Sequence, residues 1–187
     1  MLLRLLVILG ILLCGSQELF SKNPITKLQK KSQTKSQTLS RNISKNITNS
    51  FRKDGLLSFT SRSKPTSKKI ARKITGEITI NIEIAESDQA RSQGLMYRDK
   101  LAQNSGMFFL FDNEALRYFY MRDTKISLDI IFVNTQKKIV HIRRNAVPYS
   151  LEILPSKIPA RYAIEVNAGF CEKHGIAVGD CITFKRV

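Results

Sequence analysis

The alternation of apolar and polar positions is clearest after residue 76. From Glu77 to Ile84 every second residue is apolar, which is the pattern of a half-buried strand. Six further apolar segments of strand length are bounded by turn residues, at 107–111, 118–122, 128–133, 139–143, 161–166 and 181–185. Two short helices are expected, one over 89–95 with Ser87 as its N-cap and one over 168–174.

These elements predict a single α+β domain over residues 76–187. The strands outnumber the helices, so the domain is expected to be mainly β, with an antiparallel or mixed sheet that curls into a barrel-like form. Asp112 and Asn113 are expected to turn the chain after the second strand. A domain of this length can bury a core without the help of a metal or a disulfide.

The first sixteen residues have the pattern of a signal peptide. Arg4 precedes an apolar run over 5–14, and Gly15 and Ser16 then suit cleavage after Ser16. The protein is therefore expected to be exported, to the periplasm or cell envelope of a bacterium. Cys14 is an alternative processing point as the lipidated cysteine of a lipoprotein, although Leu13 stands where such signals prefer a small residue.

Residues 17–75 are basic, polar and of low complexity. Between residues 21 and 73 there are fifteen Lys or Arg and one acid, which gives 15 − 1 = +14, whereas the chain from residue 76 has 15 − 13 = +2. With one short apolar cluster at 56–59, this segment is predicted to be a disordered linker. It is either a plain solvated tether or a contact for anionic membrane or envelope polymers, and nucleic acid is not an expected partner of an exported chain.

Five side chains in the domain are candidates for a ligand site. Arg91 and Arg98 are seven residues apart and share a helical face, where they could hold a carboxylate or phosphate. Alternatively they pair internally with acids such as Asp129 or Glu165. Asp129 interrupts an apolar strand and must be exposed or paired, and Thr124 offers a hydroxyl group on a neighbouring loop.

Cysteine and methionine side chains offer two further possibilities. Cys171 and Cys181 are the two cysteines left after signal removal, and an even pair in an exported protein predicts a possible disulfide. Three methionines could bind monovalent copper, although each stands among apolar residues and suits core packing as well. They are Met96, Met107 and Met121.

The histidines give no indication of a metal site. His141 and His174 are isolated, and neither has a metal-ligating neighbour at a useful spacing. The sequence accordingly predicts no cofactor.

Four blocks of sequence carry a resemblance to a known family. They are residues 91–98 (RSQGLMYR), 106–109 (GMFF), 119–132 (FYMRDTKISLDIIF) and 165–170 (EVNAGF), followed by Gly175 and 179–180 (GD). In this order and spacing they resemble the domain of unknown function 192, a family of small bacterial and archaeal proteins. The resemblance implies a β-barrel-like fold and frequent export, with no established activity. Tyr120 and Phe170 stand where the family usually has Trp, and Ser127 stands where Pro is usual.

The interpretation favoured by the sequence is an exported, envelope-associated module without enzymatic activity, which binds a small ligand or a protein partner. One alternative is an enzyme in which Asp129, Glu165 and the two arginines act together. The other is an accessory protein that binds copper through its methionines.

Overall fold

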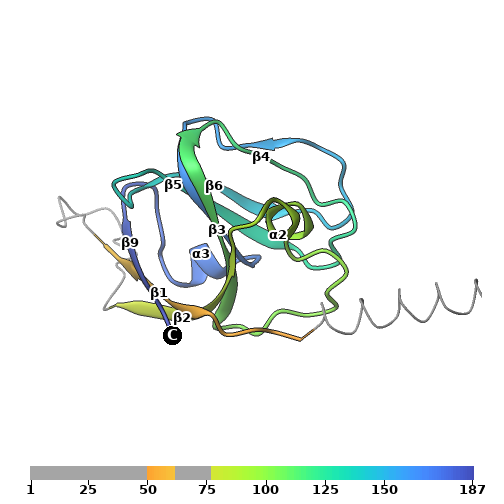
Figure 1. Cartoon of the computed structure of the whole chain (residues 1–187), viewed down its shortest axis with the longest axis horizontal. Coiled ribbons are helices and arrows are strands. Elements are labelled where there is room, and N and C mark those ends of the chain that lie inside the picture. Colours follow the sequence, from red (N-terminus) through yellow and green to blue (C-terminus); the bar gives the residue numbers. More distant parts are fainter. Residues whose placement is uncertain (1–49, 62–76) are drawn as a thin grey trace, which may run out of the picture. The chain divides into compact units, whose positions relative to one another are not determined.

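A seven-stranded sheet organises the domain. The computed structural model describes residues 50–61 and 77–187, and these form nine strands and two short helices (Figure 1). In chain order they are β1 (Gly55–Thr60), β2 (Ile78–Ala85), α2 (Asp88–Gln93), β3 (Ser105–Ala115), β4 (Tyr118–Phe119), β5 (Leu128–Val133), β6 (Ile139–Ala146), β7 (Leu154–Pro155), β8 (Ala160–Asn167), α3 (Phe170–Lys173) and β9 (Cys181–Arg186). The predicted α+β class, mainly β, is confirmed.

The sheet is mixed and open. Its strand order is β6-β5-β8-β3-β2-β1-β9, and every neighbouring pair is antiparallel except β2 and β3, which are parallel. A second sheet pairs β4 with β7. The backbone N–H of Ile139 donates to the carbonyl of Asp180 at 2.8 Å, so the edge strands β6 and β9 meet at one end. The sheet is thus curled, as expected, but it is not a closed barrel.

Helix α2 makes the crossover that the parallel pair β2 and β3 requires. The hydroxyl of Ser87 accepts a hydrogen bond from the Ala90 N–H at 3.2 Å and caps the first turn, as predicted. Gly94 ends the helix with a φ of 50°, a left-handed conformation that favours glycine. The capping residues therefore fix where α2 begins and ends.

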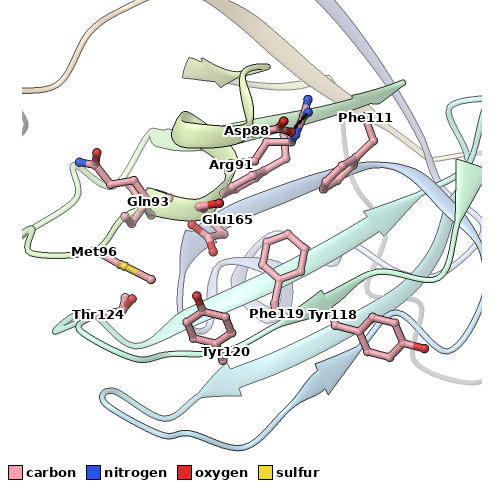
Figure 2. A pocket seen from close by; sticks show the side chains of 14 residues that line it. Asp88, Arg91, Gln93, Met96, Phe111, Tyr118, Phe119, Tyr120, Thr124 and Glu165 are labelled. Atoms are coloured by element: carbon pink, nitrogen blue, oxygen red, sulfur yellow. Dashed lines mark hydrogen bonds and ion pairs between the residues drawn. The ribbon is translucent and has the colours of Figure 1, made fainter. Parts of the chain in front are cut away.

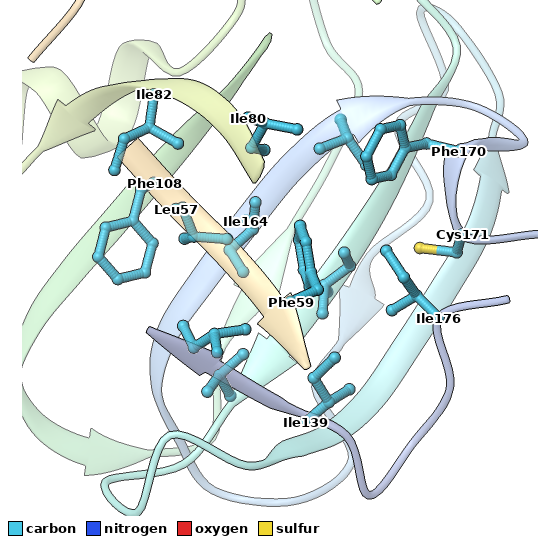
Figure 3. Packing of buried hydrophobic residues seen from close by; sticks show 14 of the residues in the cluster. Leu57, Phe59, Ile80, Ile82, Phe108, Ile139, Ile164, Phe170, Cys171 and Ile176 are labelled. Atoms are coloured by element: carbon cyan, nitrogen blue, oxygen red, sulfur yellow. The ribbon is translucent and has the colours of Figure 1, made fainter. Parts of the chain in front are cut away.

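The central strands are buried on both faces, because alternate residues of a strand point in opposite directions. On one face Leu57, Phe59 and Phe108 pack with α3, and the rings of Phe59 and Phe170 lie 6.1 Å apart (Figure 3). On the other face Phe109 belongs to a second apolar cluster with neighbouring side chains of β5 and β8. Two cores thus lie on opposite sides of one sheet.

Strand β1 corrects the prediction of a disordered linker over 17–75. It pairs with β2 on one side and with β9 on the other, so residues 55–60 are an internal strand of the sheet. The alternating side chains of Leu57 and Phe59 are fully buried, and this burial offsets the entropy of ordering the segment. The remainder of the predicted linker and the predicted signal peptide with Cys14 lie outside the described residues, apart from 50–54 and 61.

Two smaller differences concern the middle of the chain. Strand β3 continues to Ala115 and does not turn at 112–113 as expected. Its exposed polar residues lie where the register of the pairing with β8 shifts, between Leu110 and Ala115. The strand expected over 118–122 is only two residues long, and its partner β7 was not predicted. Neither helix in the described part of the chain has the length and hydrophobicity of a membrane span.

The burial of β1 leads to a test by substitution. Leu57→Ala is expected to lower the free energy of unfolding by about 2–5 kcal/mol, because it removes a fully buried side chain from the core. Leu56→Ala is the matched control. The same change falls on the preceding, half-buried position of the strand and should lower the free energy of unfolding clearly less. Urea denaturation of the full chain measures both. Equal stabilities of the wild type and Leu57→Ala would show that β1 does not belong to the core.

Candidate functional site

A pocket of about 270 Å³ opens between α2, strand β3 and the segment that follows β4 (Figure 2). Aromatic rings form much of its lining, and polar groups enter from α2 and from β8. The lining residues are Asp88, Arg91, Ser92, Gln93, Gly94, Leu95, Met96, Phe109, Phe111, Tyr118, Phe119, Tyr120, Thr124 and Glu165. Polar and apolar surfaces contribute about equally to the pocket, and a concave site with a few convergent polar groups is the usual form of a small-molecule site.

The ring of Phe119, which lines the pocket, is packed against two other aromatic rings. The ring of Phe119 meets the ring of Phe109 edge to face at 5.2 Å, and it meets Phe132 in the same way at 5.5 Å. Edge-to-face pairs of this kind add to the stability that burial provides. Tyr120, next to Phe119, is partly exposed and leaves a ring available at the pocket mouth.

The two walls of the pocket are joined by Tyr97 and Asp123. The Tyr97 N–H donates to the carbonyl of Asp123 at 2.8 Å, and the Tyr97 hydroxyl donates to the Asp123 carboxylate at 3.1 Å. Both residues have a positive φ, of 66° and 57°, so both loops turn sharply at this contact. The double contact fixes the loop after α2 against the loop that carries Thr124.

Glu165 is the polar group at the base of the pocket. It lies on β8 between Met107 of β3 and Ile130 of β5, in the centre of the sheet, and is 6% exposed. One part of its carboxyl group accepts a hydrogen bond from the backbone N–H of Leu95, while Oε2 has no hydrogen-bond partner. In Figure 2 the group points into the space between Met96 and the ring of Phe119.

Burial keeps Glu165 protonated at neutral pH. Removal of the carboxylate from water raises its pKa from 4.5 to about 8, against the opposing effects of the Leu95 N–H and the charge of Arg98. A protonated carboxyl group is a hydrogen-bond donor. The unpartnered Oε2 therefore offers the pocket a donor.

Arg98 does not neutralise Glu165 because it is already paired with Glu83. Its guanidinium makes two contacts to the Glu83 carboxylate, at 2.5 and 2.7 Å, and both side chains are buried. Glu83 of β2 lies opposite Met107 of β3, which in turn lies opposite Glu165 of β8, so the two acids are on the same face of the two strands that flank β3. One buried cation thus faces two acids and pairs with one of them.

Arg91 fastens α2 to β3 at the edge of the pocket. Its guanidinium donates to the carbonyls of Glu86 and Leu110 at 2.5 and 2.8 Å and to the carboxylate of Asp88 at 2.6 Å. It also lies over the ring of Phe111 at 5.6 Å. Arg91 and Arg98 therefore both pair internally, although with acids other than those expected.

Asp129 lies on the opposite face of the sheet from Glu165. Its pairing partner is Val166, whereas Glu165 pairs with Ile130. The Asp129 carboxylate is fully buried and accepts hydrogen bonds from the backbone N–H groups of Asn145 at 2.9 Å and Cys171 at 3.0 Å. It connects β6 to α3, and the predicted catalytic cluster of Asp129, Glu165 and the two arginines does not form.

Among the other candidates, Thr124 belongs to the pocket and the methionines are divided. Thr124 is buried, lines the pocket and donates to the carbonyl of Arg122 at 3.3 Å. Met96 lines the pocket as well, but Met107 and Met121 are buried in the core below it. The three thioethers therefore do not present a shared site for copper.

Both cysteines are free thiols, so the expected disulfide is not present. Cys171 is packed in the core beside Ile176 (Figure 3), and burial raises the pKa of its thiol, which disfavours a nucleophilic thiolate. No group of three His, Cys, Asp or Glu side chains within residues 50–61 and 77–187 could hold a metal ion.

Sequence reasoning identified Arg91, Thr124 and Glu165 as site residues and missed Glu83 and the aromatic lining. Glu83 occupies a polar position in the strict alternation of its strand, and that pattern predicts exposure. Its burial follows from the parallel pairing of β2 with β3 and from the loop that carries Arg98. The alternation alone contains no signal for that arrangement.

The protonation of Glu165 predicts a pH dependence of stability. Between its ordinary pKa of 4.5 and its folded value of about 8, the folded protein holds a proton that the unfolded chain has lost. The stability from this group is therefore complete below about pH 4.5 and declines as the pH rises to 8, by up to about 1.4 kcal/mol per pH unit. Glu165→Gln removes the titrating group and should flatten this part of the profile.

Urea denaturation from pH 5 to pH 8 measures the two profiles. Glu77→Gln, the same substitution at an exposed position, is the control and keeps the wild-type slope. Parallel profiles for the wild type and Glu165→Gln would mean that Glu165 is already ionised in the folded protein.

Solved structures and a family model give the protein's relationships. A structure from Sinorhizobium meliloti 1021, for which a role as a transcription regulator has been suggested, is 29% identical and covers 70% of this chain and 93% of its own, with a TM-score of 0.62. A protein of unknown function from Novosphingobium aromaticivorans DSM 12444 is 31% identical and covers 68% of this chain and 83% of its own, with a TM-score of 0.61. No curated protein matches the chain. The model of the family DUF192, described as "Uncharacterized ACR", matches residues 70–184, and the chain belongs to this family.

Proposed function

We propose that the domain is a non-enzymatic binding module that takes a small, uncharged, ring-containing molecule into the pocket. Glu165, in its protonated form, donates a hydrogen bond to a carbonyl or other neutral acceptor of that ligand. The observation that carries the proposal is the carboxyl group of Glu165, which lines a pocket with several aromatic rings and whose buried Oε2 has no partner. A buried polar atom without a partner is costly, so a ligand that satisfies it gains affinity.

The charges around the pocket favour a neutral ligand. A cationic ligand would require Glu165 to ionise, and the burial of that group opposes ionisation. An anionic ligand would require a free cation, but Arg91 is engaged with Asp88 and two carbonyls, and Arg98 is engaged with Glu83. Transfer of an unpaired charge into such a pocket is unfavourable.

The size of the pocket limits the ligand to a small molecule. Its volume of about 270 Å³ is just below the range for drug-sized ligands, roughly 300–1,000 Å³. The partly exposed ring of Tyr120 and the ring of Phe119 offer faces against which a ring of the ligand can pack. A single ring with one polar substituent fits this description.

An acid–base role for Glu165 is less well supported. A carboxyl group with a pKa near neutrality suits proton transfer, but such catalysis also needs a partner group beside the reacting atoms. Asp129 lies on the other face of the sheet, and both arginines are held by other groups. Binding without turnover requires no group beyond those that line the pocket.

The place of action that we propose is the bacterial envelope. The apolar run over 5–14 after Arg4 supports export, and the basic segment that follows supports attraction to anionic polymers or lipid. Mass spectrometry of the protein from fractionated host cells should find an exported chain that begins at Gln17. An acylated chain that begins at Cys14 would show that the protein is a lipid-anchored lipoprotein and is not cleaved after Ser16. An intact N-terminus in the cytoplasm would contradict export.

A series of benzene derivatives tests the pocket and its polarity. Benzamide, benzoate, benzylamine and toluene share one ring and differ in charge and in their hydrogen-bonding group. At pH 7 benzamide is expected to bind about tenfold more tightly than toluene, because it supplies an acceptor to Glu165, and the two charged compounds should bind more weakly than benzamide. Chemical shift changes of the pocket residues in NMR titrations measure the affinities.

Two substitutions at one position provide the controls. Glu165→Gln keeps a donor and should retain the preference for benzamide over toluene. Glu165→Leu removes the donor and should lose this preference while toluene still binds. The proposal fails if none of the four compounds shifts the pocket residues, or if benzylamine binds best.

A further inference from the structure

Two segments beside the pocket form a lobe, residues 116–126 and 147–159, which we call the tyrosine lobe. They lie side by side through hydrogen bonds from Ser156 N–H to the Arg117 carbonyl at 2.8 Å and from Met121 N–H to the Ser150 carbonyl at 3.0 Å. The short strands β4 and β7 pair between these contacts. The lobe is thus a defined part of the domain, visible around β4 in Figure 1.

The tyrosine lobe exposes an unusual amount of apolar surface. Eight of the twelve large hydrophobic side chains that are exposed in the described part of the chain belong to it. They are Leu116, Tyr118, Tyr120, Val147, Tyr149, Leu151, Ile153 and Ile158. Leu151 is 73% exposed and Ile153 is 63% exposed, although leucine and isoleucine are among the residues most often buried. An apolar concentration of this kind marks an interaction surface.

Basic side chains accompany these apolar ones. Arg122, Lys125 and Lys157 are exposed on the lobe, and Lys125 forms an ion pair with Asp99 outside it. Its two acids are both close to arginines, since Glu152 lies 3.2 Å from Arg143 and Asp123 lies 3.9 Å from Arg122. The lobe therefore has no unpaired acidic side chain that would repel an anionic surface.

We propose that the tyrosine lobe docks on an anionic lipid surface. Exposed aliphatic side chains enter the boundary between headgroups and acyl chains, tyrosines sit at the level of the headgroups, and lysines and arginines contact the phosphates. The net charge of +14 between residues 21 and 73 is complementary to the same surface. The lysines of the lobe favour lipid over a protein partner, because protein interfaces are depleted in lysine although they are enriched in tyrosine.

Docking by the lobe would place the pocket beside the lipid headgroups. Tyr118 and Tyr120 belong to the lobe and also line the pocket, and Figure 2 shows both rings extending from the segment below Glu165. The proposal is independent of the ligand, since the exposed side chains that carry it lie outside the pocket except for these two tyrosines.

The sequence contains no tryptophan, so one introduced tryptophan reports its own surroundings. We would place it in the full chain at the lobe, as Leu151→Trp, and at a matched exposed position elsewhere, as Val178→Trp between α3 and β9. Vesicles of phosphatidylglycerol and phosphatidylcholine in equal parts are the probe. A basic tail can hold the chain at such vesicles without the lobe, but only insertion of the lobe changes the emission of a tryptophan at position 151.

The expected result is a blue shift for Leu151→Trp and quenching by brominated acyl chains, with neither effect for Val178→Trp. Failure of both tryptophans to respond while the protein sediments with vesicles would overturn the proposal, because the tail alone would then account for binding. A blue shift of Leu151→Trp that depends on protein concentration without vesicles would overturn it as well, in favour of contact between two copies of the chain.

A second measurement does not depend on tryptophan. In the full chain, Leu151→Ser combined with Ile153→Ser should reduce partition onto the same vesicles about tenfold or more at high salt, where electrostatic attraction is screened. Val178→Ser combined with Val187→Ser removes exposed apolar side chains outside the lobe and should leave partition unchanged. Equal partition of both double variants would contradict docking by the lobe, whereas Glu165→Gln, which tests the pocket, should not affect partition.

Discussion

The buried ion pair of Arg98 with Glu83 determines the chemistry of the pocket. Two acids on the strands that flank β3 face one guanidinium, and the two short contacts to Glu83 leave Glu165 without a counter-charge of its own. A buried carboxyl group in that position stays neutral, because desolvation disfavours its ionised form. The protein thus keeps a hydrogen-bond donor at the base of an aromatic pocket without exposing a charge there.

The position of this donor depends on the alternation of strand residues. Glu165 and Val166 are neighbours in sequence but face opposite sides of β8, and the same holds for Asp129 and Ile130 in β5. The two acids that the sequence suggested as a pair are therefore separated by the sheet. Asp129 holds α3 through the Cys171 N–H, while Glu165 faces the pocket. One acid has a structural role and the other is available for a ligand.

The parts of the fold that local sequence determines were predictable. Ser87 and Gly94 set the bounds of α2 through a capping hydroxyl and a left-handed backbone, and both signals lie within the helix or next to it. Strand β1 was not predictable in this way, because its apolar residues are few and its partners β2 and β9 are distant in sequence. The burial of Leu57 and Phe59 depends on those partners.

The candidate site shows the same division. Arg91, Thr124 and Glu165 were identified from residue type and from the family resemblance, but the partner of Arg98 was expected to be Asp129 or Glu165 and is Glu83. Residue spacing can place a charged group on a helix or strand. Which of the buried acids Glu83, Asp129 and Glu165 pairs with Arg98 depends on the register of the strands. The neutral state of Glu165 follows from that choice.

The protonation state of Glu165 is the central claim, and the carboxyl resonance of this residue reports it directly. Carbon-13 NMR of the full chain, with Glu165→Gln to assign the signal, follows its titration between pH 4 and pH 9. A midpoint near 8 would show that the group is a neutral donor at physiological pH. A midpoint near 4.5 would mean that the pocket contains a carboxylate, and the proposal of a neutral ligand would then be wrong.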